Sequence, residues 1–289
     1  MRVAFLGFGL IGGSIARALR RRESGGWQLA AWTPNGEAPR AAVADGTIDA
    51  AARDVPAAVR GADIVVLASP PLDVLRLLDG LSAARPEMNV DVVITDVAST
   101  KRTILARAES LGLPFVGGHP MAGREASGYA AADAELFVDR PWVICAPKGS
   151  TAAAIDRVES LARATGARPL RMEAAAHDAA VAVVSHVPLV VSAALVEAAT
   201  AGTAAELGEA VALAAGGWAS MTRLARGDVA MGAGILSTNA DLVAERLHDV
   251  RDAIDAWLER LEAVGSDGAS DAAMRDALER ARSVLGDAR

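Results

Sequence analysis

The sequence has little of what exported, nucleic-acid-binding or disulfide-stabilised proteins need. It contains one cysteine in 289 residues, which excludes an internal disulfide. The formal net charge of -7 provides no dominant basic field for a nucleic acid or an anionic membrane. We therefore expect a cytoplasmic protein that binds small molecules, and we interpret Cys145 as a buried apolar residue.

Long apolar runs are also scarce. The chain begins with the short run Met1 to Leu6 and has no signal-peptide pattern, so we do not expect secretion. One long uncharged run, residues 179–196, contains His186 and Pro188. Because no basic or aromatic residues flank this run, we expect a fully buried helix and no membrane span.

What the sequence does contain is an alternation of two kinds of segment, with 52% hydrophobic residues overall. In residues 1–172, short apolar runs alternate with helical patterns such as 11–22 and 152–165, which predicts one parallel sheet covered on both faces. After Met172 we expect only helices, with breaks at 216–217, 232–234 and 265–270. The last helix has Met274, Leu278, Ala281 and Leu285 on one face. The expected strands are 2–6, 28–32, 63–67, 90–95, 114–116, 142–146 and 168–172.

A glycine-rich turn follows the first expected strand and opens the first helix: Gly7-Phe8-Gly9-Leu10-Ile11-Gly12. Gly7 permits a tight turn, Gly9 lets the backbone approach a pyrophosphate, and Gly12 allows close packing of helix and strand. The alternative is a glycine-rich turn that binds nothing. Its place after an N-terminal strand favours a dinucleotide site, which makes residues 1–172 a Rossmann-type domain in an α/β fold.

The acid expected at the end of the second strand, where it would bind a ribose, is missing. Thr33 stands in its place, within Trp32-Thr33-Pro34-Asn35. Without that carboxylate a 2′-phosphate is not repelled, and Thr33, Asn35 or Arg40 can bind it. We therefore expect NADP, or both NADP and NAD, as cofactor, and we also assign Ser69 to the cofactor site.

Two clusters follow later strands, where this fold places its substrate. In the segment 95–101, Ser99 either binds a substrate hydroxyl or caps the next helix, and Lys101 is assigned to substrate. In the segment 117–125, His119 stands between glycines and a proline, which leaves it no helical face to fill. An imidazole there can act as a general base near neutral pH.

A third cluster lies in the helical part. His186 is part of Ser185-His186-Val187-Pro188 and is either a core or a substrate residue, while Pro188 should disturb its helix. Arg223 follows a glycine pair and a tryptophan, and its guanidinium suits a carboxylate. We interpret His177, His248 and Cys145 as structural.

Together these motifs resemble, in order and over nearly the whole chain, those of the prephenate and arogenate dehydrogenases of tyrosine biosynthesis. The motifs are residues 7–12, 96–101, 119–125, 177–178 with 185–188, and 222–223. The resemblance implies a Rossmann domain, residues 1–172, and an all-helical domain, residues 173–289, that pairs two subunits. It implies oxidative decarboxylation of a cyclohexadienol with NAD or NADP, with no metal.

The resemblance also implies roles for individual residues. His119 corresponds to the catalytic histidine at the ring hydroxyl, and Ser99 to the serine that orients it. His186 corresponds to a histidine that contacts substrate, and Arg223 to the arginine that binds a substrate carboxylate. Glu125 corresponds to an acid at the mouth of the pocket.

Two positions depart from the family pattern. Many prephenate-specific members have a second histidine where this chain has Leu189, so use of prephenate, arogenate or both stays open. The segment 218–221 reads Trp-Ala-Ser-Met, where members often have an aromatic, a basic and an acidic residue. The chain ends at Arg289 without the regulatory domain of some members, so we expect any feedback by tyrosine to act at the active site. Two alternative functions stay open. A β-hydroxyacid dehydrogenase or imine reductase would account for the glycine loop but not for the His119 and His186 motifs. A nucleotide sensor without turnover would not need Ser99, His119 and Arg223 in one cavity, so we would expect to find them far apart.

Overall fold

The structure of the chain is a computed structural model. It describes residues 1–22, 26–124, 126–201, 204–265 and 269–287. The chain divides into two compact units, Met1–Leu242 and Val243–Arg289. The boundary that we expect between the Rossmann domain and the helical domain, at residues 172 and 173, stays a prediction.

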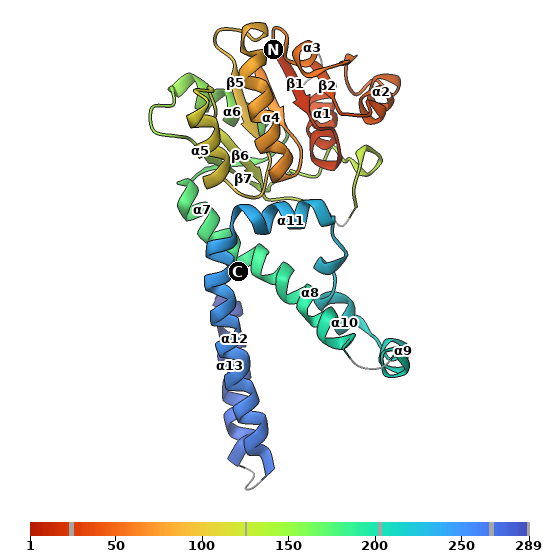
Figure 1. Cartoon of the computed structure of the whole chain (residues 1–289), viewed down its shortest axis with the longest axis vertical. Helices are drawn as coiled ribbons and strands as arrows, with labels where there is room; N and C mark the ends of the chain where they lie inside the picture. The colour runs from red at the N-terminus through yellow and green to blue at the C-terminus, as the bar shows by residue number, and fades with distance from the viewer. Residues whose placement is uncertain (23–25, 125, 202–203, 266–268, 288–289) are drawn as a thin grey trace. The chain divides into compact units, whose positions relative to one another are not determined.

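A parallel five-stranded sheet forms the first part of the chain (Figure 1). Its strands are β1 (Arg2–Leu6), β2 (Gln28–Trp32), β3 (Ala50–Ala51), β4 (Ile64–Leu67) and β5 (Val93–Asp96). They lie in the order β3-β2-β1-β4-β5, so the chain reverses its direction of winding between β1 and β4. This order is that of a dinucleotide-binding Rossmann fold. The sequence locates β1 and β2 correctly to the residue.

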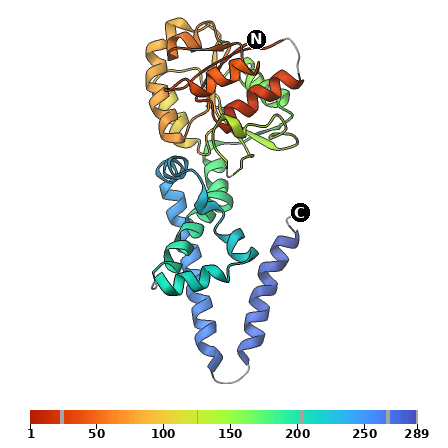
Figure 2. The same cartoon turned by 90° about the vertical axis from the view of Figure 1, so that its right-hand side faces the viewer.

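The strands read as nearly continuous apolar runs because both faces of the sheet are buried. Successive residues of β1 point to opposite faces. Val3 and Phe5 belong to one buried apolar cluster, and Ala4 and Leu6 belong to another. The sheet is therefore the middle layer of three, with helices on either side (Figures 1 and 2).

A second sheet corrects the expectation of a single parallel one. It contains β6 (Gly117–Pro120), β7 (Pro141–Cys145) and β8 (Arg168–Arg171), with β6 antiparallel to β7. The strand expected at 114–116 is wrong, because Phe115 makes only an isolated bridge with Ile94. The sequence suggested a loop at the glycines, yet a Cβ on Gly118 would come within 2.7 Å of the Asp96 carbonyl oxygen. Glycine is needed there for close packing in a strand.

Helices accompany the two sheets. They are α1 (Leu10–Arg22), α2 (Glu37–Ala44), α3 (Val55–Val59), α4 (Pro71–Ala84), α5 (Arg102–Ser110) and α6 (Ala152–Ala164). Short 3₁₀ turns lie at Arg85–Glu87 and Tyr129–Ala131. The helices expected at 11–22 and 152–165 are confirmed to within one residue at each end.

From residue 174 onward the described elements are all helical, which confirms the fold class. They are α7 (Ala174–Val181), a π-helical turn (Ala182–His186), α8 (Val187–Ala199), α9 (Ala204–Ala212), α10 (Gly216–Met221), α11 (Val229–Thr238), α12 (Ala240–Glu262) and α13 (Ala269–Asp287). Further 3₁₀ turns lie at Leu224–Arg226 and Ala263–Gly265. The π turn comes immediately before Pro188, whose missing amide hydrogen disturbs the regular pattern of hydrogen bonds.

The continuous helical stretch Ala174–Ala199 is not fully buried in the single chain. It is long and apolar enough to cross a membrane by length and composition, but only 28% of its most apolar window is buried. Val183 and Val184 are exposed. The expectation of a fully buried helix is therefore wrong, because Val183 and Val184 have no cover among the described residues.

The break expected at 232–234 is also wrong, because α11 runs through both glycines. A Cβ on Gly234 would lie 3.0 Å from Cδ of Pro71, at the start of α4. This glycine therefore allows α11 to approach α4 closely. In the second unit, Leu258, Leu278 and Leu285 are exposed, and part of the expected linker, residues 266–268, lies outside the described residues.

Candidate active site

A cavity of about 660 Å³ opens beside the carboxyl ends of β1 and β4. It lies at the point where the strand order reverses, which is where open α/β sheets bind their ligands. Its walls come from the glycine loop, the turn after β4, the segment after β5, strand β6 and the helical segment. Among its lining residues are Gly9, Leu10, Ile11, Ser69, Ser99, His119, Arg124, Ser185, His186, Leu189, Arg223, Arg226 and Ile235.

The glycine loop has the geometry that a pyrophosphate needs. Gly7 has φ +88°, and a Cβ on it would lie 2.2 Å from Ser69 Oγ. A Cβ on Gly12 would lie 3.1 Å from Cβ of Ala68, so this glycine lets α1 pack closely. Gly9 lines the cavity and has open space within 4 Å of the Cβ position. The start of α1 and this open backbone fit a dinucleotide phosphate. Phe8 differs, because its ring is buried between Phe5 and Tyr129.

The turn after β2 lies outside the lining of this cavity. Thr33 Oγ1 accepts a hydrogen bond from the backbone N–H of Gly36 at 3.1 Å. The exposed Arg40 side chain donates from Nη2 to the carbonyl oxygen of Asn35 at 3.1 Å. The guanidinium of Arg40, a residue of α2, therefore lies at the turn after β2 that contains the Thr33 hydroxyl.

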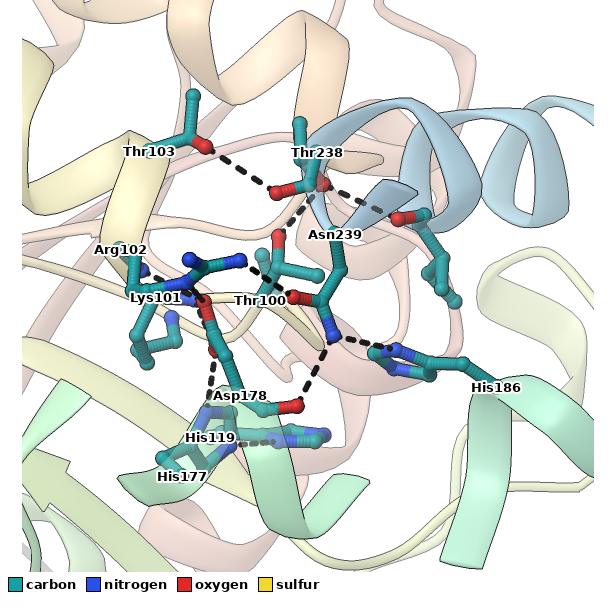
Figure 3. A network of polar contacts seen from close by, with 12 residues as sticks. Thr100, Lys101, Arg102, Thr103, His119, His177, Asp178, His186, Thr238 and Asn239 are labelled. Atoms are coloured by element: carbon teal, nitrogen blue, oxygen red, sulfur yellow. Dashed lines mark hydrogen bonds and ion pairs between the residues drawn. The ribbon is translucent and has the colours of Figure 1, made fainter. Parts of the chain in front are cut away.

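A chain of two imidazoles and one carboxylate leads to the cavity wall (Figure 3). His119, 9% exposed, has its Nδ1 2.8 Å from Nε2 of His177. His177 Nδ1 in turn lies 2.8 Å from Oδ1 of Asp178. His119 is a residue of β6, and the other two belong to α7, so the chain joins a strand to the first helix of the helical segment.

The carboxylate of Asp178 is fixed by the start of α5. Its two oxygens accept hydrogen bonds from the backbone N–H groups of Lys101 and Arg102, each at 2.8 Å. Burial alone would raise the pKa of Asp178, but the His177 bond and these two backbone bonds outweigh it and lower the pKa below its ordinary value. Asp178 is therefore ionised at neutral pH and caps α5 from another helix.

The ionised carboxylate sets the position of each proton along the chain. A carboxylate only accepts, so His177 Nδ1 carries a hydrogen and its Nε2 accepts one from His119. The remaining ring nitrogen of His119, Nε2, then has a free lone pair. Burial, with the nearby His177 and Lys101, lowers the pKa of His119 well below its ordinary value. A neutral imidazole of this kind can take a proton from a substrate hydroxyl.

The structure does not bring Lys101 to the cavity. Its side chain is fully buried and its Nζ forms an ion pair with Asp96. The expected contact with substrate is therefore not seen, and the lysine instead neutralises an acid that is also fully buried. Ser99 does line the cavity, whereas the N-terminal cap position of α5 is Lys101, so the alternative of a capping serine is wrong.

His186 reaches the same cavity from the helical segment. It is 1% exposed, and burial lowers its pKa to about 4. Its Nδ1 lies 3.2 Å from Nδ2 of Asn239, at the end of α11 (Figure 3). Its Nε2 is buried without a hydrogen-bond partner. A buried ring nitrogen of this kind in a cavity wall is a position for a ligand atom.

Three arginines also line the cavity, Arg124, Arg223 and Arg226, together with one acid, Asp228. Arg124 forms an ion pair with Asp133. The excess of arginine over acid in this lining suits an anionic substrate and the cofactor phosphates. Arg223 follows α10, with Thr222 between them. Glu125 lies outside the described residues.

Two functional residues were missed by reasoning from sequence. His177 was interpreted as structural, but its ring joins His119 to Asp178. Asn239 was not singled out, although its amide contacts His186 and Asp178. The pair His177-Asp178 stood among the motifs of the resemblance, which was a signal for the first contact. The sequence around Asn239 gave none.

Ser99, His119 and Arg223, which a nucleotide sensor has no reason to bring together, line one cavity. The cavity adjoins a glycine loop of the right geometry and contains a base and cationic groups. Fold and site therefore define a dinucleotide-dependent oxidoreductase.

Comparison with known proteins gives the family. Residues 15–170 match the family described as prephenate dehydrogenase, nucleotide-binding domain, and residues 173–272 match prephenate dehydrogenase, dimerization domain. The chain belongs to the prephenate dehydrogenase family. The prephenate dehydrogenase of Bacillus subtilis (strain 168) is 32% identical over 266 residues, which cover 91% of this chain and 68% of that protein.

Solved structures agree over the full chain. An arogenate dehydrogenase of Synechocystis is 29% identical with a TM-score of 0.77, covering 98% of this chain and 99% of that one. The prephenate dehydrogenase of A. aeolicus, in complex with hydroxyphenyl propionate and NAD+, is 26% identical with a TM-score of 0.85, covering 98% of each chain. The chain is thus an NAD(P)-dependent oxidoreductase.

Proposed function

We propose that this enzyme oxidatively decarboxylates prephenate to 4-hydroxyphenylpyruvate, arogenate to tyrosine, or both, in tyrosine biosynthesis. The observation that carries the proposal is the hydrogen-bonded chain Asp178–His177–His119, which ends at a cavity also lined by Arg223 and the glycine loop. This site combines a base for a ring hydroxyl, a cation for a carboxylate and a place for a hydride acceptor.

His119 acts as the general base. Its Nε2 takes the proton of the substrate's ring hydroxyl while the hydride leaves the same carbon, which becomes a carbonyl carbon. As His119 becomes positively charged, His177 and Asp178 stabilise the charge through the hydrogen-bonded chain. NAD(P)+ supplies the hydride acceptor when it is bound.

Decarboxylation completes the reaction without another catalytic group. The bond between the ring and its carboxylate breaks, carbon dioxide leaves, and the electron pair makes the ring aromatic. The proton held on His119 returns to the phenolic oxygen. Atoms and charges therefore balance with the keto or amino acid side chain unchanged.

Arg223 binds a substrate carboxylate, and His186 contacts the substrate from the same helical segment. Both hold the ring so that its carbinol carbon faces the cofactor, a positioning effect that makes the reaction effectively unimolecular. Ser99 bonds the ring hydroxyl beside His119, and the role that the resemblance implies for Glu125 falls on a residue outside the described ones. The shared cavity supports this division of roles.

For the cofactor we infer use of NADP, alone or together with NAD. No acid stands directly after β2 to repel a 2′-phosphate. Thr33 offers a hydroxyl in the turn, and Arg40, from α2, brings its guanidinium to the same turn. Replacing Arg40 by Ala should raise KM for NADP about tenfold, the value of one lost charged hydrogen bond, and leave KM for NAD unchanged. A hundredfold preference for NAD in the unaltered enzyme would contradict the proposal.

We further infer a cytoplasmic homodimer formed through the helical segment. The exposed apolar residues of the stretch Ala174–Ala199 and of α12 and α13 support it, since a soluble monomer rarely exposes so much apolar surface. Sedimentation at micromolar concentration tests the dimer, and a monomer there would contradict it.

The function is tested by following reduced cofactor with prephenate and arogenate, each paired with NAD and NADP. We expect turnover with at least one pair, together with release of one carbon dioxide per reduced cofactor. Turnover of a β-hydroxyacid, with none of either cyclohexadienol, would replace the proposal by a β-hydroxyacid dehydrogenase. Reduction without carbon dioxide release would contradict the decarboxylation.

A further inference from the structure

The buried Nε2 of His186 has no hydrogen-bond partner among the described residues, so its role depends on whether it carries a hydrogen. An Nε2–H donates to a ligand, whereas a bare Nε2 accepts from one. The position of the proton is decided by the partner of the other ring nitrogen, Nδ1, which is the side-chain amide of Asn239.

Two neighbours fix the orientation of that amide. Arg102 Nη2 lies 3.0 Å from Oδ1 of Asn239, and arginine can only donate. Asn239 Nδ2 lies 2.9 Å from the backbone carbonyl oxygen of Asp178, which can only accept. Turning the amide over would place donor against donor and acceptor against acceptor. The nitrogen of the amide therefore faces both Asp178 and His186 (Figure 3).

Arg102 is itself held in place. Its guanidinium donates to both oxygens of Asp241, at 2.9 and 2.6 Å, and its backbone N–H donates to Asp178. The amide of Asn239 is thus fixed by a guanidinium that an ion pair fixes in turn. Because Asn239 Nδ2 donates, His186 Nδ1 must accept.

A neutral imidazole that accepts at Nδ1 carries its hydrogen on Nε2. Burial keeps His186 neutral, because it lowers the pKa of the ring to about 4. His186, which lines the cavity, therefore carries an N–H donor on its buried Nε2. The carboxylates are common to both candidate substrates, so only the side-chain carbon at which they differ can distinguish them. There a keto oxygen matches this donor, and an ammonium group, which has only donors, does not.

We propose that Arg102 and Asn239 act as positioning residues that lock His186 as the Nε2–H tautomer, so that the site selects a keto acid over the corresponding amino acid. This selection rests on the proposed function and extends it by naming the substrate class, with prephenate preferred to arogenate. Asn239 exerts its effect without touching the substrate.

The first test reads the tautomer directly in the unaltered enzyme. The chain has four histidines, so nitrogen-15 spectra of histidine-labelled protein at pH 8 contain few signals, and His186→Gln identifies those of His186. We expect a protonated Nε2 and an unprotonated Nδ1. A protonated Nδ1 on His186 would overturn the proposal, whether or not either substrate is turned over.

The second test replaces Asn239, the residue that donates to His186 Nδ1. In Asn239→Asp the new carboxylate accepts from Nδ1, which moves the hydrogen from Nε2 to Nδ1. We expect the ratio of kcat/KM for prephenate to that for arogenate to fall about tenfold, which corresponds to one lost hydrogen bond. An unchanged ratio in a variant with unaltered circular dichroism would overturn the selection.

Two controls separate this effect from a general one. Asn89→Asp makes the same chemical change at an exposed site outside the cavity and should leave the ratio unchanged. In His186→Gln the amide donor does not depend on tautomer, so adding Asn239→Asp should no longer change the ratio. A fall of equal size in that double variant would contradict a role through His186. If neither substrate reacts with the unaltered enzyme, the proposed function fails, while the spectra still decide the tautomer.

Discussion

One wall of the cavity comes from strand β6 and another from the helical segment, and each contributes one buried histidine. The Nδ1 atoms of the two rings have opposite hydrogen-bond roles. His119, on β6, donates from Nδ1 to His177 and so leaves a lone pair on Nε2. His186, on the π turn, accepts at Nδ1 from Asn239 and so leaves a hydrogen on Nε2. Burial lowers the pKa of both rings.

The difference shows that neither burial nor residue type sets the role of these side chains. The hydrogen-bond partner at the far ring nitrogen does so, an acceptor in one wall and a donor in the other. Both partners connect to Asp178: His177 bonds its carboxylate, and Asn239 bonds its backbone carbonyl. One residue of α7 thus helps to organise a base on one wall and a donor on the other.

The largest effect should come from removing the base. In His119→Asn, turnover should fall by ~10² to 10⁴, the range for a lost general base, because no group remains to take the hydroxyl proton. Cofactor binding, measured by fluorescence titration, should be unaltered. Turnover equal to that of the unaltered enzyme would remove His119 from the mechanism.

A smaller effect is expected from Asp178→Asn, where the amide can no longer fix the proton on His177 Nδ1. We expect kcat to fall about 100-fold, the lower end of the range for a lost general base, with little change in KM, because His119 remains in place but loses the chain that orients it. His177→Phe should give a similar fall without disturbing the cap on α5. Asp79→Asn, at the surface ion pair with Arg107, is the matched control. A rise in KM at constant kcat would indicate a role in substrate binding instead.

Loss of the anchoring cation should change binding more than chemistry. Arg223→Gln should raise KM for the substrate roughly 10- to 100-fold, since charged hydrogen bonds contribute about 1.5–3 kcal/mol, and should change kcat less. The exposed Arg168, replaced by Gln, serves as control and should leave KM unchanged. A fall in kcat at constant KM would place Arg223 in the chemical step.

The smallest effect concerns stability and pH. A histidine with a lowered pKa in the folded state binds a proton more readily when unfolded, so its contribution is lost as pH falls below its ordinary value. For His186 this window runs from about pH 6.5 to about 4, with a loss of roughly 1 kcal/mol per pH unit. Denaturant unfolding should show a shallower pH dependence in His186→Gln than in His248→Gln, a change of an exposed histidine. Equal slopes would contradict the lowered pKa.

The parts of the fold that local pattern determines were predictable. Apolar runs located β1 and β2, and the spacing of Gly7, Gly9 and Gly12 located the turn at the cofactor. The glycines near residues 118 and 234 led to wrong predictions. Glycine in a sequence suggests a flexible backbone or a break, whereas the structure needs glycine at these positions because a larger residue would not fit. Close packing between distant segments leaves no local signal that separates the two uses.

In the candidate site, His119, Ser99 and Arg223 were predictable as cavity residues from their motifs. The bonds of Asp178 to the start of α5 were not, because a carboxylate 76 residues away supplies the cap that a local residue usually supplies. Lys101 was assigned to substrate because lysine is rare in this arginine-rich chain. Its ion pair with Asp96, five residues away, forms only when β5 and α5 are in place.

The π turn at Ala182–His186 has a geometric consequence for these histidines. His177 and His186 are nine residues apart, which in an α-helix of 3.6 residues per turn is two and a half turns and puts them on opposite sides. One wide turn absorbs an additional residue and rotates the following side chain back by about 100°. That rotation lets one continuous helical stretch aim both imidazoles at one network, whereas a regular α-helix of the same sequence would point His186 away from the network while His177 stayed in place.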